Sequence, residues 1–178
     1  MTKLMPKFEQ HRTDFAYCQT ITKRSSSAFY TAFSQLPLER AWSIYAVYAF
    51  CRTADDLVDV DHDIDGLMAL RQSLTTFANG HVPDHPMWRA LAVVFETYDM
   101  NLDVFFDMLT GQEQDATFKQ PQTQQALEDY CYYVAGSVGL MILPMLATNP
   151  QSLVKPAVEL GIAMQLTNIL RDVGEDYQ

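Results

Sequence analysis

The stretch AWSIYAVYAFCRTADDLVD, residues 41–59, decides the fold class of this 178-residue chain. Its first half is apolar on nearly every side, which is typical of a helix buried on most faces. Its second half places Asp55 and Asp59 at i and i+4, on one face of the same helix. Such carboxylates repel each other, and burial adds a larger desolvation cost, so protons, partner groups or a metal must neutralise them. The stretch therefore predicts a cation site inside a helical fold.

Polar side chains follow steps of three and four along this predicted helix and form one continuous stripe. The stripe comprises Tyr45, Tyr48, Arg52, Asp55 and Asp59, with Asp56 on its flank. The last predicted helix repeats the design, with Gln165, Asn168, Asp172 and Asp176 on one face. We therefore expect two interior helices to carry facing polar stripes.

The rest of the chain predicts an all-α bundle. There are only seven glycines, and the prolines fall between long helix-favouring segments, without any alternating strand pattern. We expect one domain over residues 1–178, because a chain of this length buries a single core. The predicted helices span about residues 14–23, 38–60, 65–79, 87–99, 102–114, 123–147 with a kink, and 156–177.

Composition excludes several partners and compartments. A net charge of −10 and a pI of about 4.6 argue against nucleic acid and against anionic membranes as electrostatic partners. The odd, widely spaced Cys18, Cys51 and Cys131 are typical of reduced core thiols in an intracellular protein. The start is too polar for a secretory signal, and the apolar stretch 134–147 is too short to span a bilayer. We expect a cytoplasmic protein, with peripheral membrane contact if its substrate is a lipid.

The two stripes carry the groups that hold a metal-bound diphosphate. Mg²⁺ prefers oxygen ligands and is usually held by one or two carboxylates together with substrate phosphates. Asp55 and Asp59 on one helix, and Asn168 and Asp172 on the other, supply such ligands. The neighbouring Arg52 and Arg171 offer permanently charged guanidinium groups that bind phosphate oxygens in a two-pronged geometry.

Plainer interpretations exist for each of these features. A single DDxxD motif is more often a solvated acidic face, but two motifs with adjacent arginines in apolar helices favour the metal site. Gln165 and Asn168 taken alone are satisfied core amides. The aromatic residues are individually packing residues, although in a carbocation enzyme their rings exclude water and stabilise positive charge. The aromatic residues in question are Phe29, Phe33, Tyr45, Tyr48, Tyr130 and Tyr133.

A binding protein of another class is the main alternative. Asp61, Asp63, Asp65 and Gly66 match the opening of an EF-hand calcium loop, but Gln72 stands where a bidentate glutamate belongs. We favour a solvated turn in which Asp63 or Asp65 caps the next helix. A di-iron bundle is weaker still, because no Glu-x-x-His motif occurs.

Four blocks resemble the squalene/phytoene synthase family of head-to-head prenyl transferases. They are SSSAFYTAFSQLP (25–37), AWSIYAVYAFCRTADDLVD (41–59), YCYYVAGSVG (130–139) and AMQLTNILRDVGEDY (163–177). The resemblance covers essentially the whole chain and is nearest to the bacterial members that make dehydrosqualene (4,4′-diapophytoene). It implies an all-α isoprenoid-synthase fold with a central cavity, of which this chain supplies the N-terminal part.

The resemblance also implies a role for each site residue. It assigns two or three Mg²⁺ ions to Asp55, Asp59, Asn168 and Asp172, with Asp176 as a supporting acid. Tyr130 would lie near the reacting centre, beside the catalytic Asp55, Asp59 and Asp172. Substrate contacts fall to Ser25, Ser26, Ser27, Ala28, Phe29, Tyr48, Arg52, Gln165 and Arg171. Ser25 and Ala28 stand where the family often has a histidine and a second serine, which weakens the expected phosphate contacts of this turn.

The implied reaction joins two molecules of farnesyl diphosphate through a cyclopropyl diphosphate, with no NADPH expected. Phytoene synthase, which uses geranylgeranyl diphosphate, and squalene synthase are the alternatives within the family. Family chains continue well past the second acidic motif, so we expect this chain to be incomplete at its C-terminus and inactive alone. The sequence does not predict an oligomeric state.

Overall fold

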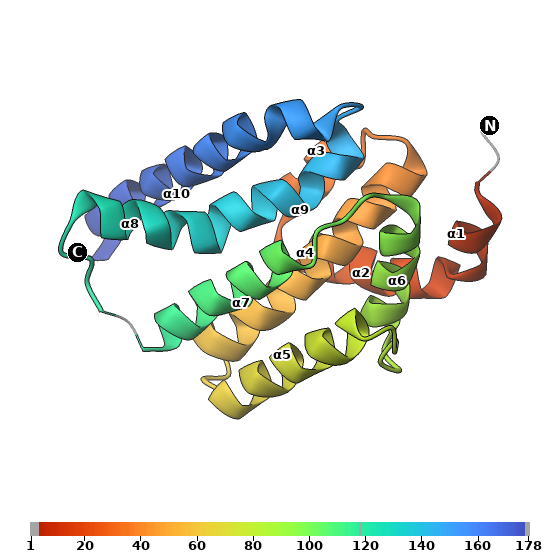
Figure 1. Cartoon of the computed structure of the whole chain (residues 1–178), viewed down its shortest axis with the longest axis horizontal. Helices are drawn as coiled ribbons and strands as arrows, with labels where there is room; N and C mark the ends of the chain where they lie inside the picture. The colour runs from red at the N-terminus through yellow and green to blue at the C-terminus, as the bar shows by residue number, and fades with distance from the viewer. Residues whose placement is uncertain (1–3, 118, 177–178) are drawn as a thin grey trace. The chain divides into compact units, whose positions relative to one another are not determined.

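The computed structural model describes residues 4–117 and 119–176, with side chains as far as Asp172 in the last helix. Every regular element in these described residues is helical (Figure 1), as the sequence predicts. The chain forms two compact units, with Met100 ending the first and Asn101 opening the second. Each unit has its own set of packed helices.

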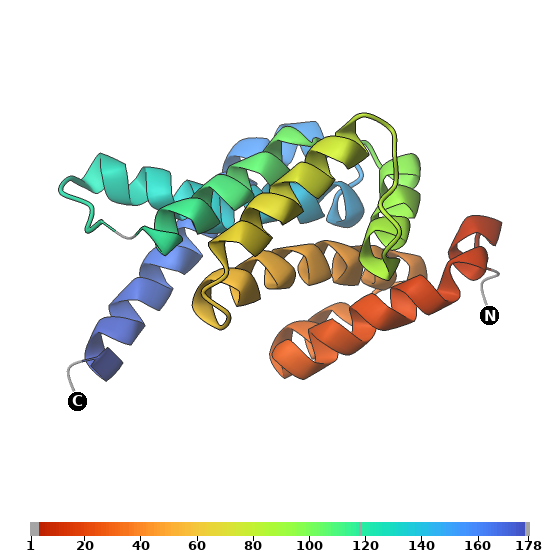
Figure 2. The same ribbon diagram turned by 90° about the horizontal axis from the view of Figure 1, so that it is seen from below.

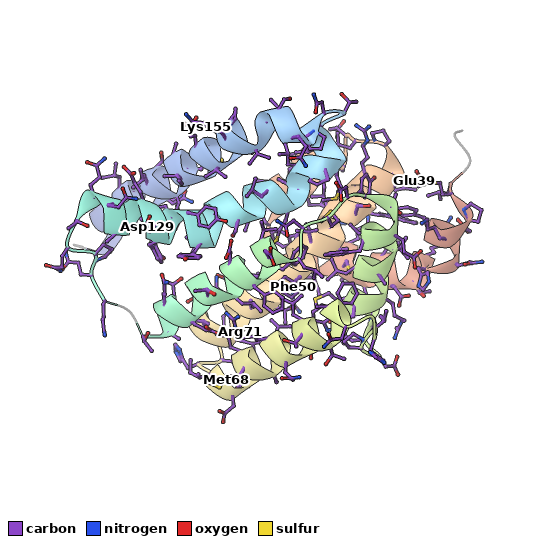
Figure 3. The ribbon with its side chains drawn as sticks, viewed as in Figure 1. Glu39, Phe50, Met68, Arg71, Asp129 and Lys155 are labelled. Carbon is purple, nitrogen blue, oxygen red and sulfur yellow. The ribbon has the colours of Figure 1, made fainter. Side chains whose placement is uncertain are left out.

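The first unit is built around α4 (Leu38–Asp59). Residues 41–47 of α4 are all buried, and so are Ala49 and Phe50, which confirms that the first half of this helix lies in the core. α4 packs against α2, α3, α5 and α6, and α2 runs beside it in Figure 2. Phe50 lies in this core, whereas Met68 of α5 projects outward (Figure 3). The other helices of the unit are α1 (Pro6–Gln10), α2 (Arg12–Ser25), α3 (Ser27–Phe33), α5 (Ile64–Ala78) and α6 (Pro86–Thr97).

A buried carboxylate joins α2 to α6. The Nε and Nη2 atoms of Arg89 donate to Oδ1 of Asp14 at 3.0 and 2.9 Å, and Nδ1 of His11 lies 2.9 Å from Oδ2. Burial alone raises the pKa of Asp14, but the hydrogen bonds from Arg89 and His11 outweigh it and hold that pKa below its ordinary value. Asp14 is therefore a charged cross-link inside the first unit.

The acidic turn before α5 is a helix cap. Oδ1 of Asp63 accepts a hydrogen bond from the backbone N–H of Gly66 at 2.8 Å, which satisfies a free donor at the start of α5. A Cβ on Gly66 would lie 2.4 Å from the Asp63 carboxylate, so the cap requires glycine there. The structure thus favours the capped turn over the calcium loop.

The second unit contains a long helix with an irregular centre. α8 (Gln124–Cys131) continues through a π-helical segment, η1 (Tyr132–Gly136), into α9 (Ser137–Leu146). Its partners are α7 (Asp103–Ala116) and α10 (Val154–Asp176), which lies along α8 and α9 in Figure 1. A short 3₁₀ turn, η2 (Pro150–Leu153), precedes α10. The expected kink in this helix is therefore a π segment.

Two glycines let neighbouring helices approach the π segment closely. A Cβ on Gly111 of α7 would lie 2.9 Å from Cγ1 of Val134, and one on Gly161 of α10 would lie 2.8 Å from the carbonyl oxygen of Ala135. Both distances are shorter than a carbon atom allows. The backbone of α10 therefore lies directly against the backbone of η1, and the backbone of α7 lies against the side chains of Val134 and Tyr133 in η1.

The expectation that the apolar stretch near residue 140 is too short to cross a membrane needs correction. The continuous helix from Gln124 to Leu146 is long and apolar enough to do so, by length and composition only. The expectation considered only the apolar stretch 134–147, whereas the helix that contains it begins at Gln124 and continues through the π segment. One such helix is weak evidence of a membrane span, and this one packs on α7 and α10 in the second unit.

Candidate active site

The first acidic motif is organised around one guanidinium group on α4. Nη1 of Arg52 donates to Oδ2 of Asp55 at 2.8 Å, and Nη2 donates to Oδ1 of Asp56. These are contacts one helical turn apart, because residues at i+3 and i+4 share a face with residue i. In the described part of the chain, Nε of Arg52 is buried and has no hydrogen-bond partner. Arg52 is thus held by its two outer nitrogens.

Asp55 lies in an environment that disfavours its charge. Burial and the nearby carboxylate of Asp59 raise the pKa of Asp55, with a smaller contribution from Asp56, and Arg52 opposes them. A bound cation would relieve the same repulsion, so Asp55 fits a metal ligand. Asp59 itself is exposed and Asp55 is half-buried. The sequence places this pair in a stretch apolar enough to be buried, but only the apolar Ala54 and Val58 of this turn are buried, and they lie on another face of the helix.

The serine-rich turn of the sequence becomes the start of α3. Ser26 is the N-cap, and its Oγ accepts a hydrogen bond from the backbone N–H of Phe29 at 3.3 Å. Ser25 ends α2, whereas Ser27 and Ala28 already lie in α3. The structure thus gives Ser26 a capping role, while its contact with phosphate stays a prediction.

An aromatic cluster joins α3 to the stripe on α4. The ring of Phe29 lies 4.7 Å from that of Tyr48 and 4.4 Å from that of Phe33, measured between centroids. Tyr48 is half-buried, and burial raises the pKa of its hydroxyl, so it stays protonated. The structure brings together two of the predicted substrate contacts, Phe29 and Tyr48, one turn before Arg52.

Tyr45 does not belong to the exposed polar stripe. Its side chain is only 2% exposed, and its hydroxyl donates to the backbone carbonyl of Tyr30 at 3.1 Å. The two rings also stack, with centroids 5.5 Å apart. Periodicity placed Tyr45 on the face of Arg52, but α3 covers this end of the face. Tyr45 is therefore a core residue, as its packing interpretation holds.

The second acidic motif lies on α10 in the second unit. Gln165, Asn168 and Asp172 are half-buried and share one helical face, as the sequence predicts. Nε of Arg171, which is mostly exposed, donates to Oδ1 of Asp172 at 2.8 Å. The side chain of Asp176 lies outside the described residues. An arginine–aspartate pair thus occurs beside this face too, between adjacent residues, whereas the pairs on α4 are one helical turn apart.

Tyr130 borders a small cleft near the start of the long helix. The cleft has a volume of about 330 Å³ and is also lined by Gln114, Thr117 and Lys119. Two residues beyond, the hydroxyl of Tyr132 donates to Oδ2 of Asp107 at 2.5 Å, and burial together with this bond raises the pKa of Tyr132. The Asp107–Tyr132 pair is not predictable from sequence spacing, because the two residues come from separate helices.

Asp56 is a further residue whose contacts were not predicted from the sequence, which placed it only on the flank of the polar stripe. In the structure Asp56 binds Arg52 and lines a cleft of about 590 Å³ together with Tyr17, Arg24 and Asp61. The sequence does contain a signal for this ion pair, because Asp56 follows Arg52 by four residues and oppositely charged side chains at that spacing pair on helices.

The donor set fits Mg²⁺ when phosphate completes the coordination. In the residues that the structure describes, no three His, Cys, Asp or Glu side chains are grouped to hold a metal ion. Mg²⁺ does not need such a group, since one or two carboxylates plus substrate phosphates suffice. Asp55 and Asp59 offer this arrangement on α4, and Asn168 and Asp172 offer it on α10. Both sets consist of oxygen donors, the type that Mg²⁺ prefers.

Comparison with known proteins identifies the family. The squalene/phytoene synthase family matches residues 22–178, which include both acidic motifs. The chain belongs to this family.

The individual relatives of this squalene/phytoene synthase family member belong to the same family. It is 38% identical over 174 residues to a 4,4′-diapophytoene synthase of Staphylococcus haemolyticus, covering 93% of the chain and 60% of the relative. A phytoene synthase of Arthrospira platensis is 36% identical over 91% of the chain and 58% of the relative. A crystal structure of a dehydrosqualene synthase superimposes with a TM-score of 0.93 at 60% identity, over 97% of this chain and 61% of that one.

These matches confirm the predicted isoprenoid-synthase fold and the predicted family. They also show that the chain spans about 60% of the length of the relatives it matches.

Proposed function

We propose that the complete enzyme joins two molecules of farnesyl diphosphate head to head and forms dehydrosqualene (4,4′-diapophytoene) for carotenoid biosynthesis. The observation that carries this proposal is the Arg52–Asp55 pair on α4 repeated as Arg171–Asp172 on α10, in a chain 60% identical to a dehydrosqualene synthase. Phytoene and squalene synthesis belong to the same family and differ in substrate length or in the fate of the intermediate.

Asp55, Asp59, Asn168 and Asp172 are the residues that would hold Mg²⁺, with Asp176 in support. When bound, the metal would supply the electrophilic pull on the departing diphosphate. The other residues act around it. Arg52 and Arg171 bind diphosphate oxygens and stabilise the negative charge that develops as the allylic carbon–oxygen bond breaks.

The aromatic side chains have a separate task. Phe29 and Tyr48 form one wall from α3 and α4, and their rings exclude water from the allylic cation. Ring faces also attract positive charge, which favours the cation over its neutral precursor. The double bond of the second farnesyl chain then attacks the cation, and loss of a proton from the new cation closes the ring of the cyclopropyl diphosphate. Gln165 and Tyr130, both in the second unit, would contact the diphosphate and the prenyl chain as the family resemblance implies.

The proposal also covers the location of the enzyme, which we place in the cytoplasm with peripheral contact to a membrane that receives the hydrocarbon. The acidic composition gives no electrostatic reason for tight binding to anionic lipid. Contact would instead depend on the apolar product.

Metal dependence and two substitutions test the proposed site. Calorimetric titration of the complete enzyme with a non-hydrolysable farnesyl thiodiphosphate should show binding that requires Mg²⁺ and disappears with chelator. Asp59→Ala and Asp172→Ala should each lower turnover by at least about 10²-fold, the usual cost of losing one electrostatic stabiliser. Folding should survive, because Asp59 is exposed and the Arg171–Asp172 ion pair is largely exposed, so neither change leaves a buried charge unpaired.

Asp61→Asn is the matched control. Asp61 is exposed, lies two residues past Asp59 and carries the same charge, so its loss should leave turnover unchanged. Equal analogue affinity with and without Mg²⁺, or near-normal turnover in Asp59→Ala and Asp172→Ala, would refute the assignment.

A further inference from the structure

Asp56 belongs to the first acidic motif but is not one of its proposed metal ligands. Its Oδ1 accepts from Nη2 of Arg52, whereas Asp55 accepts from Nη1 of the same guanidinium. The remaining nitrogen, Nε, is buried and finds no hydrogen-bond partner among the described residues. The anchorage of Arg52 therefore rests on two carboxylates, one inside the proposed metal site and one beside it.

These two anchors differ once substrate binds. A cation held by Asp55 would neutralise that carboxylate and repel the guanidinium, which would weaken the Arg52–Asp55 contact. Asp56 is unaffected in this scheme and still holds Nη2. Without Asp56, a long and flexible arginine side chain would be free to turn away from the diphosphate, at a cost in rotamer freedom each time it returns.

We propose that Asp56 is a positioning residue that keeps Arg52 aimed at the substrate diphosphate after Asp55 has taken up the cation. The inference rests on the proposed function and extends it to a residue outside the metal-ligand set. Asp56 touches neither the metal nor the reacting carbons in this scheme, and it acts only through Arg52.

A merely structural ion pair would behave differently. Both side chains are about one-third exposed, at 31% for Arg52 and 32% for Asp56, and a pair of this kind on a helix surface has a small effect on folding. A structural role predicts a change in thermal stability without a change in substrate affinity. A positioning role predicts the reverse, with KM rising more than kcat falls.

A double-mutant cycle on the complete enzyme separates these roles. The variants are Asp56→Asn, Arg52→Gln and the double substitution, and the probe is farnesyl thiodiphosphate titrated at saturating Mg²⁺. Asp56→Asn should weaken analogue binding about tenfold, a coupling typical of residues in direct contact. In the Arg52→Gln background the same substitution should have no further effect, because the residue it acts through is gone.

Two further variants complete the design. Asp56→Glu keeps the charge within reach of Arg52 and should restore most of the affinity. Asp61→Asn removes a charge from the same cleft without touching Arg52 and should bind the analogue as the wild type does. Circular dichroism melting of every variant reports on folding, and Asp56→Ser replaces Asp56→Asn if the latter fails to fold.

The outcomes are distinct. An additive effect of Asp56→Asn in the Arg52→Gln background would show that Asp56 acts directly on the ligand or the cation, and would overturn the inference. Wild-type affinity in Asp56→Asn would also overturn it while leaving the proposed function intact. Absence of Mg²⁺-dependent binding in the wild-type enzyme would refute the proposed function itself.

Discussion

Single residues in this chain show how burial decides the role of a polar group. Tyr45 and Arg52 lie on one helix with spacing that suggests a shared stripe, yet Tyr45 is a core residue and Arg52 holds two carboxylates. Asp14 combines both situations, because it is buried and still charged. Its partners, Arg89 and His11, make that possible.

Asp14→Asn should destabilise the protein in a pH-dependent way. The pKa of Asp14 is lowered in the folded state, so its ionised form adds stability at pH values above the ordinary aspartate pKa of about 3.9. That stability is lost as the pH falls through the lower, folded pKa. At pH 7 we expect a loss of about 1–3 kcal/mol in the free energy of unfolding, measured with urea.

The gap between wild type and Asp14→Asn should narrow below about pH 4, as the wild-type carboxyl becomes protonated. Asp61 is exposed, so the Asp61→Asn variant should have the same free energy of unfolding as the wild type at every pH. A difference between wild type and Asp14→Asn that stays constant from pH 7 to pH 3 would contradict the role given to the Arg89 and His11 contacts.

Among the elements, the π segment depends most on its surroundings. Tyr132–Gly136 has an apolar, glycine-containing sequence that predicts a kink, and in the structure this π segment lies closely against α7 and α10. π segments of this kind occur often at functional sites. Here the segment fixes α10, which carries Gln165, Asn168 and Asp172, against the helix that carries Tyr130.

Gly161→Ala tests this packing. The new methyl group would lie 2.8 Å from two backbone atoms, the carbonyl oxygen of Ala135 and Cα of Gly136, which cannot rotate away. We expect a loss of about 1–3 kcal/mol in the free energy of unfolding from overpacking, even though alanine has the higher helix propensity. Gly139→Ala, whose Cβ would lie 3.1 Å from the carbonyl oxygen and 3.7 Å from the carbonyl carbon of Ala157, should cost less. Equal stabilities in urea titrations of the two variants would contradict the account.

Much of this architecture is predictable from the sequence, and the exceptions have physical reasons. The helix over residues 38–59 and the polar face of Gln165, Asn168 and Asp172 follow from periodicity, because the 3.6-residue repeat is local information. The π segment, the burial of Tyr45 and the Asp107–Tyr132 bond depend on residues distant in sequence. The pairing of Asp56 with Arg52 is local, but the spacings of three and four do not show that one guanidinium binds both Asp55 and Asp56.

At the scale of the whole molecule, the chain forms two compact units and is shorter than the relatives that it matches. The chain spans 61% of the dehydrosqualene synthase chain that it matches, and α10 exposes the large apolar side chains of Leu160, Met164 and Leu170. Exposed apolar surface of this kind promotes association. The partial coverage and the exposed apolar side chains both bear on whether the 178 residues are active and monomeric when they are produced alone.

We predict that the isolated 178-residue chain does not turn over farnesyl diphosphate with Mg²⁺ and that it oligomerises or aggregates. Light scattering and a hydrocarbon assay on the purified chain test both statements. Addition of the remaining part of the enzyme as a second chain should reduce the association. A monodisperse monomer that converts farnesyl diphosphate would show that the 178 residues suffice for catalysis.

The most direct test of the central claim is the identity of the hydrocarbon made by the complete enzyme. The enzyme is incubated with Mg²⁺ and either farnesyl or geranylgeranyl diphosphate, without NADPH, and the products are separated by chromatography and identified by mass spectrometry. The account predicts thirty-carbon dehydrosqualene from farnesyl diphosphate, abolished by chelator. A preference for geranylgeranyl diphosphate with forty-carbon phytoene as product, or the same yield with and without Mg²⁺, would contradict it.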